Sequence, residues 1–357
     1  MPYWLRVFSL WFIIMLLQAF NWSRFNLESF MGQLMFITYP FLLVQIFKEK
    51  TFRYFSNIVV FFTIISFFLF IPSFISKEIH QIIFSFGKTL GLDVFHPWKT
   101  SFLIYTCEPL FTGEILRNAS MFSEPGNYAC HIGLALSFNL FYYNNLFTKK
   151  NLILILGMLT TFSTAGYIIL YFIIAYYYFI LHKTKDLKTI FLFIIFAFAI
   201  VYSFTKLEFM SEKIENYYER EENTDEKVKG RFGAAIKNLQ EIKEHPIIGR
   251  GLLIQTRFDG EDEWKKGEKP WQNLNSWTNY LVQLGIPGFI LFMIWYINSI
   301  KKFVEKENKS IKFVFLIFGS IFIGLSSQAI LVTPPFLSIL YLGYYYKINQ
   351  SSFHILK

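Results

Sequence analysis

The chain has 357 residues, of which 54% are hydrophobic and 21% aromatic, but only 17% carry a charge. A water-soluble domain usually has about 25% charged residues, so the composition excludes an ordinary soluble enzyme and favours a membrane protein. The formal net charge of +9 does not indicate nucleic-acid binding, because Lys and Arg gather at the cytoplasmic ends of membrane spans. The two cysteines, Cys107 and Cys130, are too few for a disulfide framework or a thiolate metal site.

Eight apolar stretches come close to the length of a membrane span or exceed it, since a spanning helix needs about 20 mostly apolar residues. They are 3–20, 27–47, 55–76, 126–147, 151–181, 189–204, 277–300 and 313–346. The fifth and the eighth are too long for one span, and each is interrupted in its middle. The interruptions are Ser163-Thr-Ala-Gly166 in one, and Ser326-Ser-Gln328 followed by Pro334-Pro335 in the other. Each of these two stretches therefore predicts a hairpin of two short spans, which makes about ten spans in all.

Basic residues in the short connections set the orientation, because they resist translocation. With ten spans and both termini cytoplasmic, the cytoplasmic side receives 16 Lys and Arg against four acidic residues. Two longer segments, 77–125 and 205–275, then form outer loops, and the larger one carries 13 basic and 15 acidic residues. The first apolar stretch lacks a small-residue cleavage site, so we expect it to be retained as a span. The sequence thus predicts a single all-α polytopic membrane domain over residues 1–357.

The first outer loop ends in a run of polar residues. Arg117-Asn-Ala-Ser-Met-Phe-Ser-Glu124-Pro125-Gly126 leads directly into the fourth predicted span. Pro and Gly can fix the start of that helix, which would hold the Glu124 carboxylate and the Arg117 guanidinium near the outer membrane edge. An acidic residue at a helix N-terminus is also the ordinary electrostatic preference, so a simple capping role for Glu124 is the alternative.

Three arginines of the large outer loop stand out beside the two glycine-containing motifs or after them, namely Arg231, Arg250 and Arg257. Their planar, permanently charged side chains are the ones best suited to phosphate oxygens, although any of them can equally be a solvated surface residue. Glycines on both sides of Arg250, at 249 and 251, predict a tight turn whose backbone can approach a ligand.

The span that follows the large loop begins with polar residues from Asn275 onward, and Gly285 and Gly288 lie within it. This pattern suits the mouth of a cavity and close helix packing. The six histidines show no pair at metal-ligand spacing, so we expect no metal site.

The order of these motifs resembles the O-antigen polymerase and ligase family over residues 117–288. The motifs are Arg117, Phe122-Ser-Glu-Pro-Gly126, Thr161-Phe-Ser-Thr-Ala-Gly166, Gly230-Arg231, His245-Pro-Ile-Ile-Gly-Arg-Gly251, Asn275-Ser-Trp277 and Gly285-Ile-Pro-Gly288. The resemblance implies a GT-C-like glycosyltransferase of the bacterial inner membrane that needs no metal or other cofactor. Its active site would face the periplasm or the outside.

The implied substrate is a glycan carried on undecaprenyl diphosphate. The lipid bilayer is an implied partner, and so are a flippase and a chain-length regulator, whereas no nucleic acid is expected. Arg231 would contact the diphosphate, and Arg117 would belong to the same site. Arg250, Arg257 and Asn275 are the further candidates for binding substrate.

One departure from the family pattern separates the alternatives. Ligases and many polymerases have a His-Asn pair before the span that follows the large loop, and this chain has Leu274-Asn275. The missing His favours a repeat-unit polymerase over a ligase, and it leaves Glu124 and His245 as candidates for the general base. A transporter of lipid-linked glycans is the alternative from another class. It is disfavoured because the predicted spans are almost free of charge and no internal repeat is visible.

Overall fold

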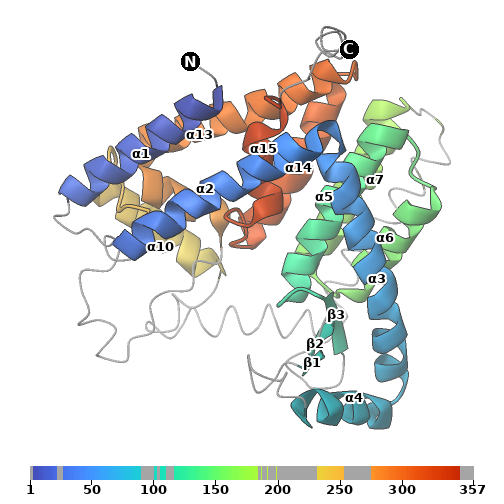
Figure 1. Cartoon of the computed structure of the whole chain (residues 1–357). Coiled ribbons are helices and arrows are strands. Elements are labelled where there is room, and N and C mark those ends of the chain that lie inside the picture. The colour runs from blue at the N-terminus through green and yellow to red at the C-terminus, as the bar shows by residue number, and fades with distance from the viewer. Residues whose placement is uncertain are drawn as a thin grey trace, which may run out of the picture. The chain divides into compact units, whose positions relative to one another are not determined.

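The computed structural model describes residues 3–21, 27–89, 100–102, 105–109, 116–183, 231–252 and 275–345, together with 186, 191 and 198. This part of the chain is mostly helical and divides into two compact units (Figure 1). Unit 1 comprises Met1–Arg53, Ala234–Val314 and Ala329–Lys357, and unit 2 comprises Tyr54–Gly233 and Phe315–Gln328. Each unit is therefore assembled from segments that are distant in the sequence.

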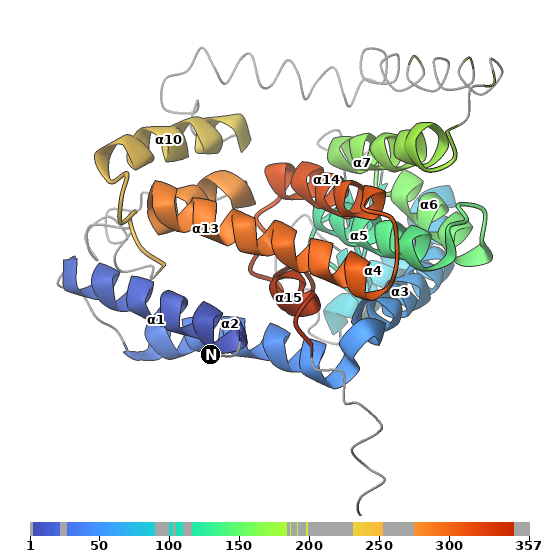
Figure 2. The ribbon, with the colours of Figure 1, turned by 90° about the horizontal axis from the view of Figure 1, so that it is seen from above.

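Unit 1 is built from helices that pack through α15. Its helices are α1 (Tyr3–Asn21), α2 (Leu27–Phe47), the short 3-10 turn η1 (Lys48–Lys50), most of α10 (Arg231–Glu244), α13 (Ser276–Lys306) and α15 (Pro334–Leu342). Helix α15 lies between α2 and α13 and contacts both, while α1 runs beside α2 (Figure 2). Aromatic side chains join these helices, as in the edge-to-face pair of Phe41 and Tyr341 at 5.5 Å.

Unit 2 contains the remaining helices and a small sheet. Its elements are α3 (Thr51–Ile75), α4 (Lys77–Thr89), β1 (Thr100–Phe102), β2 (Tyr105–Pro109), β3 (Leu116–Ser120), α5 (Pro125–Tyr143), α6 (Lys149–Thr160), α7 (Thr164–Ala175), the π-helical η2 (Tyr176–Leu181) and most of α14 (Lys312–Ser327). Helix α5 packs against both α6 and α7. The α5–α7 contact is close because Gly166 faces Ala129, and a Cβ added at Gly166 would lie 2.9 Å from the Ala129 Cβ.

Both long apolar stretches contain two helices, as their interrupted patterns predict. Helix α6 ends at Thr160 and α7 begins at Thr164, with Phe162 between them at a positive φ of 43°. Ser163 ends the interruption, since its hydroxyl accepts the capping hydrogen bond from the Gly166 amide. In the eighth stretch α14 ends at Ser327, and α15 begins at Pro334, where proline is favoured because its missing N–H needs no partner.

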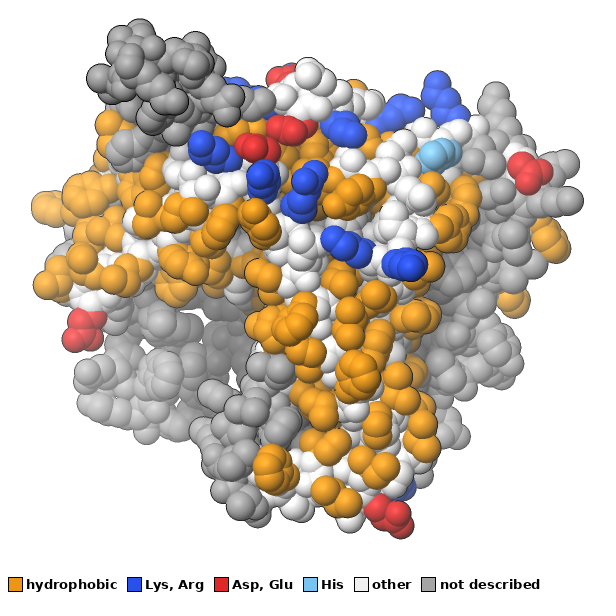
Figure 3. Space-filling view, turned by 45° about the vertical axis from the view of Figure 1, so that its right-hand side comes forward, with side chains coloured by type: hydrophobic (Ala, Val, Ile, Leu, Met, Phe, Trp, Pro, Cys, Tyr) orange, Lys and Arg blue, Asp and Glu red, His pale blue; other side chains and the backbone are white. Residues whose placement is uncertain are grey.

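Three described segments are long and apolar enough to cross a membrane, namely Phe30–Ile75, Thr164–Leu181 and Ser276–Lys306. Two shorter apolar helical segments are Leu5–Asn21 in α1 and Lys312–Ser327, which is α14. Exposed hydrophobic side chains cover much of the face shown in Figure 3, as is expected of a surface that meets lipid rather than water. The predicted span 189–204 falls almost wholly outside the described residues. The ten-span topology, with its two outer loops at 77–125 and 205–275, stays a prediction.

The expectation of an all-α fold needs one correction, because residues 100–102, 105–109 and 116–120 form a three-stranded antiparallel sheet in the order β1-β2-β3. Burial alternates along β2, where Tyr105 and Cys107 are buried and Thr106 and Glu108 are partly exposed. This two-residue period is the mark of a strand with one packed face. It was missed because hydropathy averaged over a span-length window does not detect strands of three to five residues.

Candidate functional site

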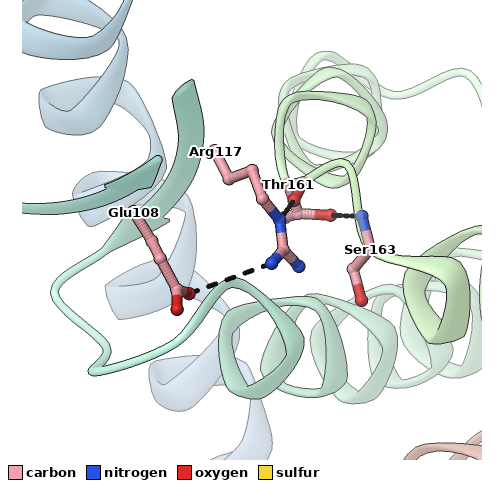
Figure 4. Close-up of polar contacts among 4 residues, drawn as sticks. All are labelled: Glu108, Arg117, Thr161 and Ser163. Carbon is pink, nitrogen blue, oxygen red and sulfur yellow. Dashed lines mark hydrogen bonds and ion pairs between the residues drawn. The ribbon is translucent and has the colours of Figure 1, made fainter. Parts of the chain in front are cut away.

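Arg117 lies in unit 2, on β3, and its guanidinium reaches the interruption between α6 and α7 (Figure 4). Its Nε donates a hydrogen bond to the Thr161 carbonyl oxygen at 3.3 Å, and its Nη1 lies 3.9 Å from the Glu108 Oε2. Glu108 stands directly opposite Arg117 in the β2–β3 register, so both side chains share one face of the sheet. The Arg117 side chain is only 11% exposed, so its positive charge is fixed in position and largely shielded from solvent.

The position of β3 is fixed by the neighbour of Arg117, Asn118, whose side chain is fully buried. Its amide nitrogen donates to Ser66 Oγ on α3 at 3.0 Å and to Thr160 Oγ1 on α6 at 3.1 Å. Its amide oxygen accepts from the Ser120 backbone at 2.9 Å. Because these groups are paired and most of them are buried, the network locks β3 against two helices. Arg117 is therefore presented from a rigid support.

Glu124 stands at the N-cap position of α5, immediately before Pro125. Its backbone carbonyl accepts from the Tyr128 amide at 3.0 Å, but its carboxylate makes no capping hydrogen bond. The alternative in which Glu124 is a simple side-chain cap therefore lacks the hydrogen bond that defines a cap. The α5 terminus follows β3 after a turn of four residues, so Glu124 and Arg117 belong to the same end of unit 2.

In unit 1, the loop that follows α10 lies against a break in α13. Gly285 has φ 70° and ψ 171°, which interrupts the helix, and Pro287 has no N–H to donate to the Gln283 carbonyl. The loop supplies the missing partners. The Arg250 amide donates to the Val282 carbonyl at 2.8 Å, and the Gly251 amide donates to the Gln283 carbonyl at 3.2 Å. In return the Ile286 amide donates to the Pro246 carbonyl at 2.8 Å, so the broken helix keeps its backbone groups paired.

Gln18 on α1 also binds both the loop after α10 and the broken part of α13. Its Nε2 donates to the Ile248 carbonyl at 2.9 Å and to the Gln283 carbonyl at 2.7 Å. Its Oε1 accepts from the Leu252 amide at 3.0 Å, and the side chain is 1% exposed. One glutamine thus ties α1, the loop and α13 together in an apolar setting, where each unpaired group would be costly.

Replacing Gln18 by leucine should lower the free energy of unfolding by about 2–4 kcal/mol, because buried partners are left unsatisfied. The expected readout is a lower melting temperature of the purified protein in detergent. Leu16→Ala on the same helix is the matched control, since Leu16 is 44% exposed and its truncation removes no buried hydrogen bond. Equal melting temperatures for Gln18→Leu and wild type would contradict the inferred role of Gln18.

Arg250, six residues after the end of α10, is bound back to the last residue of that helix. Its Nη2 donates to Glu244 Oε2 at 2.7 Å, and the Arg250 side chain is 15% exposed. The flanking glycines have positive φ angles, 74° at Gly249 and 104° at Gly251. Their tight turn was predicted, but the backbone approached is that of α13, since a Cβ at Gly249 would lie 2.5 Å from the Gly285 nitrogen. The approach of this turn to a ligand stays a prediction.

The remaining predicted site residues are placed as follows. His245 lies just after α10 and is partly buried, and its carbonyl accepts from the Gly249 amide at 3.1 Å. Asn275 is the N-cap of α13, where its Oδ1 accepts from the Thr278 amide at 3.1 Å. Arg231 is the first residue of α10, although its side chain is outside the described atoms, and Arg257 lies outside the described residues.

Among the described residues, no group of three or more His, Cys, Asp or Glu side chains is placed to hold a metal ion. Unit 2 thus brings together Arg117, Glu108 and the tip of the α6–α7 pair. Unit 1 brings together Arg250, His245 and the break in α13. Glu108 and Gln18 were not singled out from the sequence. A lone glutamine in an apolar helix is the signal that would have found Gln18, because such a residue needs buried partners.

A helical chain with segments of this length and apolarity is a membrane protein. Residues 151–293 match the family model described as O-antigen ligase, a range that begins in α6 and ends in α13. The match confirms the predicted resemblance to the O-antigen polymerase and ligase family. No curated protein and no solved structure matches the chain. Among the predicted site residues, Arg231, His245, Arg250, Arg257 and Asn275 lie inside the matched range.

Proposed function

We propose that this protein is a polymerase of undecaprenyl-diphosphate-linked repeat units, which transfers a growing glycan from its lipid diphosphate onto the next lipid-linked unit. The proposal rests mainly on Arg117. Its guanidinium is fixed by contacts with Thr161 and Glu108, and it lies beside the turn between α6 and α7, which falls inside the range that matches the family model. A lipid-linked diphosphate needs permanent positive charge at the membrane edge, and a bidentate guanidinium supplies it.

Contacts in both units support the predicted topology. Arg117 lies near the end of the first predicted outer loop and bonds to Thr161, at the tip between two helices that the topology also places outside. Gln18 lies near the predicted outer end of α1 and bonds to the loop at Ile248. After the break, residues 286–306 at about 1.5 Å each are long enough to cross about 30 Å of hydrocarbon. Arg250 would then lie at the outer membrane edge.

In the proposed reaction, a hydroxyl oxygen of the acceptor sugar attacks the anomeric carbon of the donor glycan. The bond from that carbon to the diphosphate oxygen breaks, and the lipid diphosphate leaves with the electron pair. Arg117 and Arg231 would stabilise the negative charge that develops on the leaving group, and this attraction strengthens where water is partly excluded. The hydroxyl proton passes to a general base, for which Glu124 is the first candidate and His245 the second.

The ligase reaction is a second candidate, because the matching family model is described as O-antigen ligase. A ligase would transfer the finished polymer to lipid A-core. The sequence favours the polymerase, since Leu274 occupies the position where ligases have His. Neighbouring Asn275 is used as a helix cap through its Oδ1.

The test is the length distribution of surface glycan after the gene is deleted and restored as wild type or as Arg231→Ala. A polymerase predicts that deletion and the variant both reduce the ladder to one repeat unit on the lipid core, because the diphosphate contact is lost. A lipid core without glycan, with long polymer retained on undecaprenyl diphosphate, would instead identify a ligase. An unchanged ladder in the deletion strain would refute both.

A further inference from the structure

Helix α4 carries an apolar stripe that the rest of the fold leaves exposed. Ile79, Ile82 and Phe86 follow one another at spacings of three and four, so they share one side of the helix. Their exposed fractions are 40%, 67% and 54%. Gln81 lies on a different side of the same helix and is also exposed. An exposed apolar side beside an exposed polar side is the pattern of a helix that lies in a membrane interface.

We propose that α4 lies in the outer interface of the phospholipid bilayer, with Ile79, Ile82 and Phe86 in contact with acyl chains. The side of α4 that carries His80 packs against the protein. His80 Nδ1 lies 3.8 Å from the buried Cys107 Sγ on β2, and α4 contacts β1. Burial on this protein-facing side lowers the pKa of His80, which disfavours the charged imidazole there.

The orientation of α4 relative to α3 supports lipid as the occupant. The two helices are separated by Ser76 alone, and α4 lies across the end of α3 (Figure 1). Ser76 stabilises this bend, since its amide donates to the Pro72 carbonyl at 3.0 Å and its Oγ accepts from the Ile79 amide at 3.3 Å. If α3 crosses the bilayer, a helix that lies across its outer end runs along the membrane surface.

The apolar stripe of α4 is also continuous with exposed apolar side chains at the end of α3. At the end of α3 nearest to α4, Ile71, Phe74 and Ile75 are 48%, 50% and 78% exposed. These side chains belong to a segment apolar enough to span a membrane, so hydrocarbon is their natural neighbour. The exposed stripe of α4 begins four residues after Ile75, directly beyond the bend.

This placement has a consequence for the site, which rests on the proposed function. Helix α4 contacts β1, β1 pairs with β2, and β2 pairs with β3, which carries Arg117. An α4 seated in the interface would therefore fix the depth of Arg117 relative to the lipid phosphates. A diphosphate attached to a membrane-embedded lipid lies at that same level.

The experiment compares an environment-sensitive fluorophore attached at Ile82→Cys with the same label at Gln81→Cys. The native Cys107 and Cys130 are 0% and 3% exposed, and unmodified protein labelled in parallel gives their background. Each protein is placed in nanodiscs of phosphatidylethanolamine and phosphatidylglycerol, with or without lipids that carry a nitroxide near the top of the acyl chain. No glycan substrate is present, so the result does not depend on the proposed function.

We expect a blue-shifted emission at position 82 and a several-fold stronger quenching by nitroxide lipid there than at position 81. Equal and weak lipid quenching at both positions would overturn the proposal. So would a label at position 82 that is shielded from aqueous iodide but not quenched by lipid, because protein would then cover the stripe. Ile79→Cys, compared with the same Gln81→Cys control, repeats the test one turn earlier, in case Ile82→Cys does not fold.

Discussion

Replacing Arg117 by alanine should reduce polymer formation by about 100-fold, the usual effect of removing one preorganised contact to developing charge. The guanidinium is positioned by the Thr161 carbonyl and Glu108, and β3 contains no other basic side chain that could replace it. Arg117→Lys keeps the charge but loses the planar fork, and we expect an intermediate rate. The rate is measured with purified protein and the strain's own lipid-linked repeat unit, and the glycan ladder is recorded in cells.

Two controls separate this effect from a loss of folded protein. The first is the amount and melting temperature of each variant in detergent, which should stay close to wild type for Arg117→Lys. The second is Lys309→Ala, which removes an exposed positive charge on the predicted cytoplasmic side. A stable Arg117→Ala protein that still makes the wild-type ladder would remove Arg117 from the site.

Much of the helical architecture was predictable from the sequence, because membrane spans are defined by long apolar runs. The interruptions were predictable for a related reason. Small and polar residues at 163–166 and the prolines at 334 and 335 are unfavourable inside a helix or favour its start. The sheet β1-β2-β3 was not predictable in this way, since its strands are short and its stability comes from contacts with α4 and α5.

The candidate site was only partly predictable. Arg117 and Arg250 stood out because charged residues are rare in this chain. Arg250 is also flanked by two glycines, and Arg117 opens the polar run that ends in Pro125-Gly126. Their partners did not stand out, because Glu108 and Gln18 become significant only when the chain folds. Glu108 precedes Arg117 by nine residues and meets it through strand pairing, while Gln18 meets residues more than 200 positions away. No local pattern encodes contacts of that kind.

Replacing Gly285 by alanine should destabilise the protein severely, by about 3 kcal/mol or more. The backbone there has φ 70° and ψ 171°, a region that is essentially restricted to glycine, and strain of this kind alone costs about 1–3 kcal/mol. A Cβ at this position would also overlap the Ile247 carbonyl oxygen, only 2.2 Å away. The Ile247 carbonyl belongs to the backbone of a loop whose flanking residues are hydrogen-bonded to α13. It therefore cannot move aside without breaking those bonds. The measurement is the yield of monodisperse protein and its melting temperature in detergent.

Gly32→Ala is the matched control for Gly285→Ala. Gly32 lies within α2, and a Cβ added there would meet no atom within 4 Å. The same chemical change should therefore leave yield and melting temperature at the wild-type level. If Gly285→Ala behaved like Gly32→Ala, the break in α13 would not require glycine. The loop that presents Arg250 would then need another arrangement, because its amides at 250 and 251 pair with carbonyls that only the break exposes.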